Sequence, residues 1–137
     1  MKCLDTTLLI DIVEHPKEAK QIVERFEQER ETLATTTFNA YEALLGAHSV
    51  RDGGHRTKLL DLYSRVLSRL VLLPLSLEDA AKAAELGGEL RRQGRDVGAD
   101  ALTAAIALRG GCDGVVTRNV DHFRRIEGIA GLAVVPY

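Results

Sequence analysis

Short apolar runs alternate along this chain with longer stretches of helical periodicity. The runs are brief and rich in Leu, Val or Thr, whereas the stretches between them repeat apolar residues every three to four positions. Five strands are therefore predicted, at residues 2–4, 32–36, 71–75, 114–117 and 132–135. Strands separated by helices are typical of a parallel sheet covered by helices on both faces. We therefore expect one compact α/β domain over residues 1–137.

The helical stretches carry start and stop signals. Helices are predicted at residues 7–14, 17–31, 38–50, 55–70, 77–93 and 99–108. Pro16 suits the start of the second, because its missing N–H costs nothing in a first turn. Ser76 and Asp79 resemble a capping box before the fifth. Pro74 makes residues 71–75 an edge strand, because proline rarely lies in the middle of a sheet. Asn119 could cap a further short helix after the fourth strand.

Composition narrows the class of protein. Of the 137 residues, 45% are hydrophobic and 28% charged, which is ordinary for a soluble globular protein. No apolar run approaches the roughly 18 residues of a membrane span, and Asp5 lies where a signal peptide would be apolar. Cys3 and Cys112 are too far apart in the sequence for a disulfide framework or a Cys-based zinc site. We expect two buried free thiols and a cytoplasmic protein.

Charge is distributed unevenly along the chain. The net charge is −2, but residues 1–50 contain five Lys/Arg against nine Asp/Glu, and residues 51–75 contain five against two. A polyanionic substrate would therefore need local basic groups or a bound cation to offset the acids. The basic stretch can also be explained as the solvated face of a helix.

Two acids directly follow predicted strands. Asp5 comes after the first strand, beside the hydroxyls of Thr6 and Thr7, and Asp121 comes after the fourth. Because parallel strands end at the same edge of a sheet, both acids should lie at the edge where ligands gather. Each also has a simpler interpretation: Asp5 could be a helix N-cap, and Asp121 a first-turn acid.

Two further acids lie on predicted helices. Glu42 shares a helical stripe with Phe38 and Leu45. A carboxylate on a buried apolar stripe costs several kcal/mol unless it is paired, protonated or metal-bound, although a glutamate at the edge of the stripe could reach water. Asp100 begins a helix of small residues that can approach another element closely, but it could also serve only to complement the helix dipole.

The four carboxylates together are more informative than any one of them. If they converge at one sheet edge, they repel one another unless a cation is bound. Mg²⁺ and Mn²⁺ prefer oxygen ligands and keep several waters. A cation held in this way can activate a water and neutralise charge on a phosphodiester.

Four segments that contain these acids resemble motifs of the PIN-domain family, and more narrowly of the VapC ribonuclease toxins of toxin–antitoxin pairs. The motifs are LDTTLLID at 4–11, TTFNAYEAL at 36–44, DALTAAIA at 100–107 and TRNVDHF at 117–123. Each motif is short, but all four occur in order, and the resemblance covers essentially the whole chain. One departure is Thr103, where many members have a larger aliphatic residue; we expect this to affect packing more than chemistry.

The resemblance implies a three-layer α/β/α PIN-like domain with a mainly parallel sheet of about five strands. It also implies a metal-dependent endoribonuclease whose acidic pocket holds Mg²⁺ or Mn²⁺. In that pocket Asp5 and Asp100 would contact the metal, Glu42 would position the attacking water, and Asp121 would hold metal-bound waters. The polar side chains expected to line or support the pocket are Thr7, Thr117 and Asn119.

The resemblance further implies partners: an RNA substrate, a second copy in a homodimer, and a cognate VapB-type antitoxin whose tail plugs the site. DNA would be reached only through the antitoxin. An arginine from the tail would suit a bare acidic pocket, because guanidinium pairs bidentately with carboxylate. Arg118, or a basic residue of 51–69, could steer the RNA backbone.

Other function classes remain as alternatives. A receiver-like phosphoacceptor domain also places acids around Mg²⁺, but it would want a lysine after a late strand, and none follows Thr117. A non-catalytic module could use the acids only to dock a basic partner. A histidine mechanism is disfavoured, because the four histidines lack metal-ligand spacing and only His122 adjoins a motif.

Overall fold

A parallel sheet forms the centre of the molecule. The computed structural model describes the backbone of residues 1–137 and, except for Ile129, their side chains. The strands lie in the order β3-β2-β1-β4-β5, and every neighbouring pair is parallel. The strands are β1 (Lys2–Leu4), β2 (Leu33–Thr36), β3 (Val71–Leu73), β4 (Gly114–Thr117) and β5 (Ala133–Pro136). The predicted α/β fold with five parallel strands is confirmed, and β3 lies at an edge.

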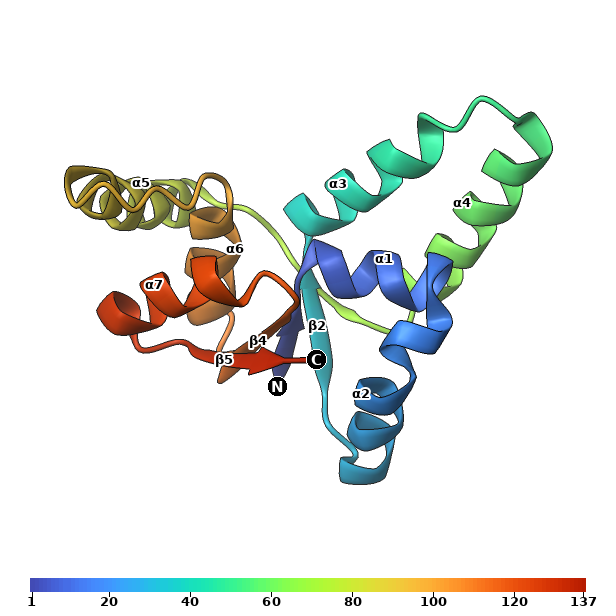
Figure 1. Ribbon diagram of the computed structural model, residues 1–137, viewed down its shortest axis with the longest axis horizontal. Coiled ribbons are helices and arrows are strands. Elements are labelled where there is room, and N and C mark those ends of the chain that lie inside the picture. The colour runs from blue at the N-terminus through green and yellow to red at the C-terminus, as the bar shows by residue number, and fades with distance from the viewer.

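Helices cover both faces of this sheet, so the fold has three layers (Figure 1). One layer contains α1 (Thr6–Glu14), α2 (Pro16–Glu29), α3 (Thr37–His48) and α4 (Gly53–Leu67). The other contains α5 (Leu77–Arg92), α6 (Asp100–Arg109) and α7 (Val120–Ala130). The helix α7 extends much further than the short capped helix that the sequence suggested after Asn119.

Each helical layer packs on its own hydrophobic core. Side chains of adjacent strand residues point to opposite faces of a sheet, so Cys3 of β1 joins the core under α5, α6 and α7, whereas Leu4 joins the core under α1. Both cysteines are free and buried, as predicted. No helix within the described residues is long and apolar enough to cross a membrane.

Local signals in the sequence set several helix starts. Pro16 is the first residue of α2, and Ser76 and Asp79 form the predicted capping box of α5. At the C-terminal end of α7, Gly131 adopts a left-handed conformation with a φ of 74°, which glycine tolerates without a steric cost. This turn returns the chain to the sheet as β5.

The strand order puts β1 at the centre, between β2 and β4. In the registers of these pairs, Leu4 lies opposite Thr35 and Val116. The three strands therefore end at about the same level, so that Asp5, which follows β1, shares one edge of the sheet with Thr36 and Thr117, the last residues of β2 and β4. The carboxyl edge of a parallel sheet is where ligands bind in open α/β folds.

Candidate active site

Asp5 lies at the carboxyl end of the central strand and is only 3% exposed. Its Oδ2 accepts a hydrogen bond of 2.8 Å from the Thr117 hydroxyl and a longer one of 3.3 Å from Thr7. Burial raises the pKa of the Asp5 carboxyl, and the hydrogen bond from Thr117 opposes that rise. Although Asp5 is the N-cap residue of α1, the described structure contains no side-chain capping bond from it. The carboxylate is therefore oriented by hydroxyls from α1 and β4.

Asp100 begins α6 and faces the loop between β4 and α7. Its Oδ2 accepts a 2.7 Å hydrogen bond from Asn119 Nδ2 and lies 2.8 Å from His122 Nδ1. Burial raises the pKa of the Asp100 carboxyl, the contact with His122 opposes the rise, and the negative charges of Asp5 and Glu42 add to it. Asp5 and Glu42 are therefore close enough for their charges to act on Asp100.

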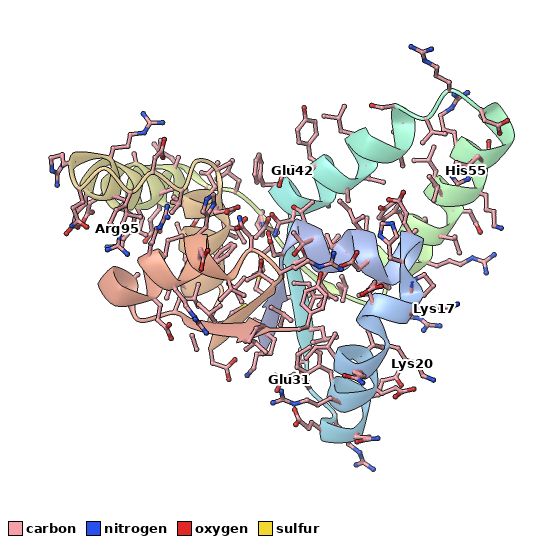
Figure 2. The ribbon with its side chains drawn as sticks, viewed as in Figure 1. Lys17, Lys20, Glu31, Glu42, His55 and Arg95 are labelled. Atoms are coloured by element: carbon pink, nitrogen blue, oxygen red, sulfur yellow. The ribbon has the colours of Figure 1, made fainter. Side chains whose placement is uncertain are left out.

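Glu42 lies on α3 (Figure 2), and its Oε1 accepts a 2.7 Å hydrogen bond from the Thr6 hydroxyl, at the start of α1. The stripe that it shares with Phe38 and Leu45 is not a core face, since Leu45 is 51% exposed. The helix instead buries its small residues, because these allow α3 to pack closely on its neighbours. Glu42 is therefore a solvent-accessible carboxylate at the rim, as the simpler interpretation of the sequence had it.

Beneath Glu42, the fully buried Asn39 connects the elements that carry the three acids. Its Nδ2 donates to the backbone oxygen of Leu4, at 3.2 Å, and its Oδ1 accepts a 2.8 Å hydrogen bond from Thr103. Asn39 thus ties α3 to the end of β1 and to α6. Thr103, which we expected to affect mainly packing, is part of this polar connection.

Asp121 is the one predicted acid that, within the described residues, makes no side-chain hydrogen bond or ion pair with a residue of the site. It is exposed in the first turn of α7. Within the described residues, no hydrogen bond or ion pair connects it to Asp5, Glu42 or Asp100. The next residue, His122, contacts Asp100 instead, because the turn of the helix points residue 122 toward α6.

Two residues that contribute hydrogen bonds to this site, Asn39 and His122, were not identified as site residues from the sequence. Asn39 had only a weak signal: an amide in the first turn of a helix, three residues before Glu42. His122 had a clearer one, because it lies three residues after Asn119 and so shares a helical face with it if a helix begins there. Both signals depend on a helix start that the sequence alone did not fix.

The chemistry of this site is that of a hard-cation site. The donors are carboxylate oxygens, with hydroxyl and amide groups behind them. Within the described residues, no group of three or more His, Cys, Asp or Glu side chains is placed so that together they could hold a metal ion. Mg²⁺ does not require such a group, because it keeps several waters and commonly binds through one or two carboxylates. Repulsion among buried acids is the second feature that a divalent cation would relieve.

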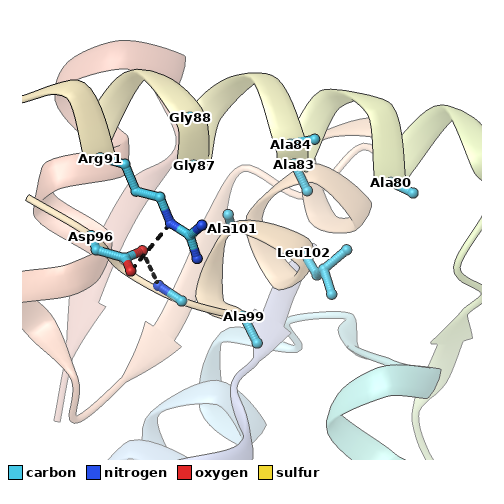
Figure 3. Close-up of a pocket in the computed structure, with 11 residues that line it drawn as sticks. Ala80, Ala83, Ala84, Gly87, Gly88, Arg91, Asp96, Ala99, Ala101 and Leu102 are labelled. Atoms are coloured by element: carbon cyan, nitrogen blue, oxygen red, sulfur yellow. Dashed lines mark hydrogen bonds and ion pairs between the residues drawn. The ribbon is translucent and has the colours of Figure 1, made fainter.

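Concave shape alone would not locate this site. A cavity of about 370 Å³ lies between α5 and the start of α6 (Figure 3), lined mainly by alanine and glycine. Its charged lining residues, Arg91 and Asp96, pair with each other at 3.3 Å, and Asp96 also accepts a hydrogen bond from the Gly98 backbone. The acids of the sheet edge do not line this cavity.

Comparisons with known proteins agree with this fold. The family model described as the PIN domain matches residues 2–129, which is most of the chain. Comparison with curated protein sequences gives no match.

Several solved structures have a similar fold over nearly the full length. DNA-bound VapBC from Salmonella typhimurium contains a chain with a TM-score of 0.80 and 26% identity, covering 98% of this chain and 96% of that one. VapBC2 from Rickettsia felis, bound to a promoter fragment, gives 0.79 and 24%, covering 99% and 98%. VapC20 of Mycobacterium tuberculosis, a sarcin–ricin loop cleaving toxin, gives 0.60 and 14%, covering 84% and 87%.

Proposed function

This chain belongs to the PIN domain family, and we propose that it is a metal-dependent endoribonuclease, the toxin of a VapBC-type toxin–antitoxin pair. The observation that carries the proposal is that Asp5, Glu42 and Asp100 come from three elements and that the charges of Asp5 and Glu42 act on Asp100. Such a group of acids is poorly suited to a structural role, because it raises the pKa of the Asp100 carboxyl, which within the described residues pairs only with His122 and with no Lys or Arg.

The carboxylate oxygens of this site fit Mg²⁺ or Mn²⁺, and we propose that Asp5 and Asp100 hold the cation. When bound, the cation would supply a water of lowered pKa and charge neutralisation at the scissile phosphate. The hydroxyls of Thr117 and Thr7 fix the orientation of the Asp5 carboxylate, and Asn119 and His122 fix that of Asp100. Such outer partners keep ligand oxygens aligned.

The remaining acids would act on water rather than on the phosphate. Glu42 is accessible to solvent and held by Thr6, so its carboxylate can orient the attacking water and accept a proton from it. Asp121, exposed one turn away, would reach the site through water molecules. The reaction is hydrolysis, in which the water oxygen bonds to phosphorus and the bond from phosphorus to the leaving sugar oxygen breaks.

The proposed partners are inferred from the complexes in which the similar solved structures occur. The Salmonella and Rickettsia structures are DNA-bound VapBC complexes, and the structure of FitAcB from Neisseria gonorrhoeae has a similar fold. We propose a VapB-type antitoxin for this chain, contact with DNA through that antitoxin only, and a homodimer. RNA as the substrate is supported by VapC20, which shares the fold and is a toxin that cleaves the sarcin–ricin loop.

Cleavage of labelled RNA in the presence of Mg²⁺ or Mn²⁺ tests the activity. Asp5→Asn and Asp100→Asn should each lower the rate at least about 100-fold, since removing even the outer partners of a metal ligand costs 10–100-fold. Asp61→Asn is the matched control, because Asp61 is an exposed acid of α4 paired only with Arg65. Asp121→Asn should cost less than Asp100→Asn. Cleavage by both site variants at the wild-type rate would overturn the proposal.

A further inference from the structure

A second buried carboxylate, Asp11 of α1, has no part in the proposed hydrolysis. Asp11 is only 4% exposed. Its Oδ1 lies 3.0 Å from His15 Nδ1, and its Oδ2 accepts a 2.6 Å hydrogen bond from the Tyr137 hydroxyl and pairs with the Arg118 guanidinium. These partners come from the end of α1, the residue after β5 and the loop after β4. A buried charge with several partners of this kind is a built feature, since it would otherwise be costly.

The cluster holds the Arg118 side chain in a defined position. The guanidinium carbon lies 5.7 Å from the centre of the Tyr137 ring, within the range of a cation–π contact. Burial and the hydrogen bond to Asp11 raise the pKa of Tyr137 to about 12, so its hydroxyl remains a donor at neutral pH. Arg118 is nevertheless 52% exposed, which leaves several of its N–H groups open to solvent.

The backbone of Arg118 belongs to the acidic site itself. Its N–H donates to the Thr7 hydroxyl at 3.1 Å, and that hydroxyl donates to Asp5. The residues on either side, Thr117 and Asn119, hold Asp5 and Asp100 respectively. The fixed guanidinium is therefore attached to the same short loop that orients two of the three acids.

An RNA strand that enters this site brings phosphates toward carboxylates and needs a cation to offset the repulsion. A planar guanidinium, already immobilised and half open to solvent, binds phosphate at a low cost in conformational entropy. We propose that Arg118 binds a phosphate of the RNA strand next to the scissile one, and that Asp11 and Tyr137 are the residues that position it. The proposal rests on RNA being the substrate.

RNA binding without metal tests Arg118 separately from catalysis. Fluorescence anisotropy of a labelled single-stranded RNA, measured with a chelator over a range of salt concentrations, compares wild type with Arg118→Gln. The variant should bind about five- to tenfold more weakly, and the slope of log affinity against log salt should fall by about 0.7, the value for one phosphate contact on a single strand. Arg118→Lys should keep the slope and recover part of the affinity.

Arg25→Gln is the matched control, because Arg25 is an exposed arginine of α2 that pairs with Glu29, and its removal should change neither quantity. An unchanged slope and affinity in Arg118→Gln would overturn the proposal. So would the absence of measurable wild-type binding without metal, because the guanidinium is held in place by protein groups alone. If wild type binds RNA as expected but cleaves none with Mg²⁺ or Mn²⁺, it is the proposed nuclease activity that fails.

The positioning role of Asp11 is tested by the kinetics of RNA cleavage. Asp11→Asn should raise KM several-fold with a smaller effect on kcat, because it loosens a group that binds the substrate in the ground state. The double variant with Arg118→Gln should have the KM of Arg118→Gln alone, since Asp11 acts through that side chain. If the KM increases of the two single variants multiply in the double variant, Asp11 acts independently of Arg118 and the positioning role is wrong. Tyr137→Phe keeps the ring and removes only one hydrogen bond, so it gives the same test if Asp11→Asn folds poorly.

Discussion

Asp100 illustrates how a single site residue can oppose the stability of the fold. Its carboxyl is largely buried, and its pKa is raised by that burial and by the charges of Asp5 and Glu42. The folded protein therefore holds the Asp100 proton more tightly than the unfolded chain does, and the associated stability is lost as the pH rises through the folded pKa. At neutral pH, without metal, the charged carboxylate makes a net unfavourable contribution.

Asp100→Asn should therefore melt a few degrees higher than wild type at neutral pH in the presence of a chelator. The neutral amide still offers an oxygen to Asn119 but is not repelled by Asp5. The difference should disappear below about pH 4, where the wild-type carboxyl is also protonated. Thermal melts followed by circular dichroism, with Asp61→Asn as the control, provide the measurement. A lower melting temperature for Asp100→Asn at neutral pH would contradict this account.

Between elements, the clearest polar connection outside the site joins α5 to α6. Asp79 is almost fully buried and accepts two hydrogen bonds from Arg109, of 2.6 and 2.9 Å. Arg109 also donates to the backbone oxygen of Pro74, at 2.8 Å. The Arg109 guanidinium lowers the pKa of Asp79 to about 2. Because Asp79 also caps α5, one ion pair fixes the start of α5 and the end of α6.

Arg109→Gln should lower the free energy of unfolding at neutral pH, because it leaves the buried Asp79 carboxylate without its charged partner. Because the pKa of Asp79 is lower in the folded protein than in the unfolded chain, where it is near 4, the carboxylate stabilises the fold at pH values above 4. That contribution is lost as the pH falls toward 2. The gap between variant and wild type should therefore narrow in acid. Urea unfolding at neutral pH and near pH 2 measures this difference in the free energy of unfolding. The control is Arg91→Gln, which removes an exposed ion pair with Asp96. A gap independent of pH would rule out the ion pair as its cause.

The elements themselves were largely predictable, because each has a local cause. The five strands are short apolar runs, and Pro16, Ser76 and Asp79 mark helix starts wherever they lie in the fold. The sequence understated α7, because residues 117–123 resemble a polar loop motif, whereas packing on β5 and α6 sustains a helix to Ala130. Glu42 was placed on a buried stripe because periodicity does not show which face of α3 meets the core.

At the scale of the whole molecule, the site depended on topology that the sequence allowed us to infer only in part. Asp5 and Asp100 could be placed together because strand ends and helix starts meet at one sheet edge. The contacts of Asp11 with Arg118 and Tyr137 could not be predicted from the sequence. They join residues that are 107 and 126 positions apart, and they depend on side-chain orientation alone. Asp121 and His122 are neighbours in the sequence, and only the start of α7 decides which one faces Asp100.

A divalent cation should stabilise the whole domain if it binds as proposed. Mg²⁺ or Mn²⁺ at about 100 times its Kd adds about 2.7 kcal/mol, provided that the unfolded chain does not bind it, so the melting temperature should rise measurably. The rise should shrink as the pH falls, because protons compete for Asp5 and Asp100, whose pKa values are raised. Differential scanning calorimetry with and without the metal measures the shift. An equal shift in wild type and Asp5→Asn would place the cation elsewhere.

The central position of β1 also determines when the candidate site can assemble during synthesis. The Asp5 carboxylate is made before its hydroxyl partner Thr117, which is 112 residues further along the chain. The strand beside β1 that carries Thr117, and the loop that orients Asp100, leave the ribosome only after those residues have been translated. A nascent chain that has not reached this point contains no assembled site, so the nuclease that we propose could not act on RNA before then.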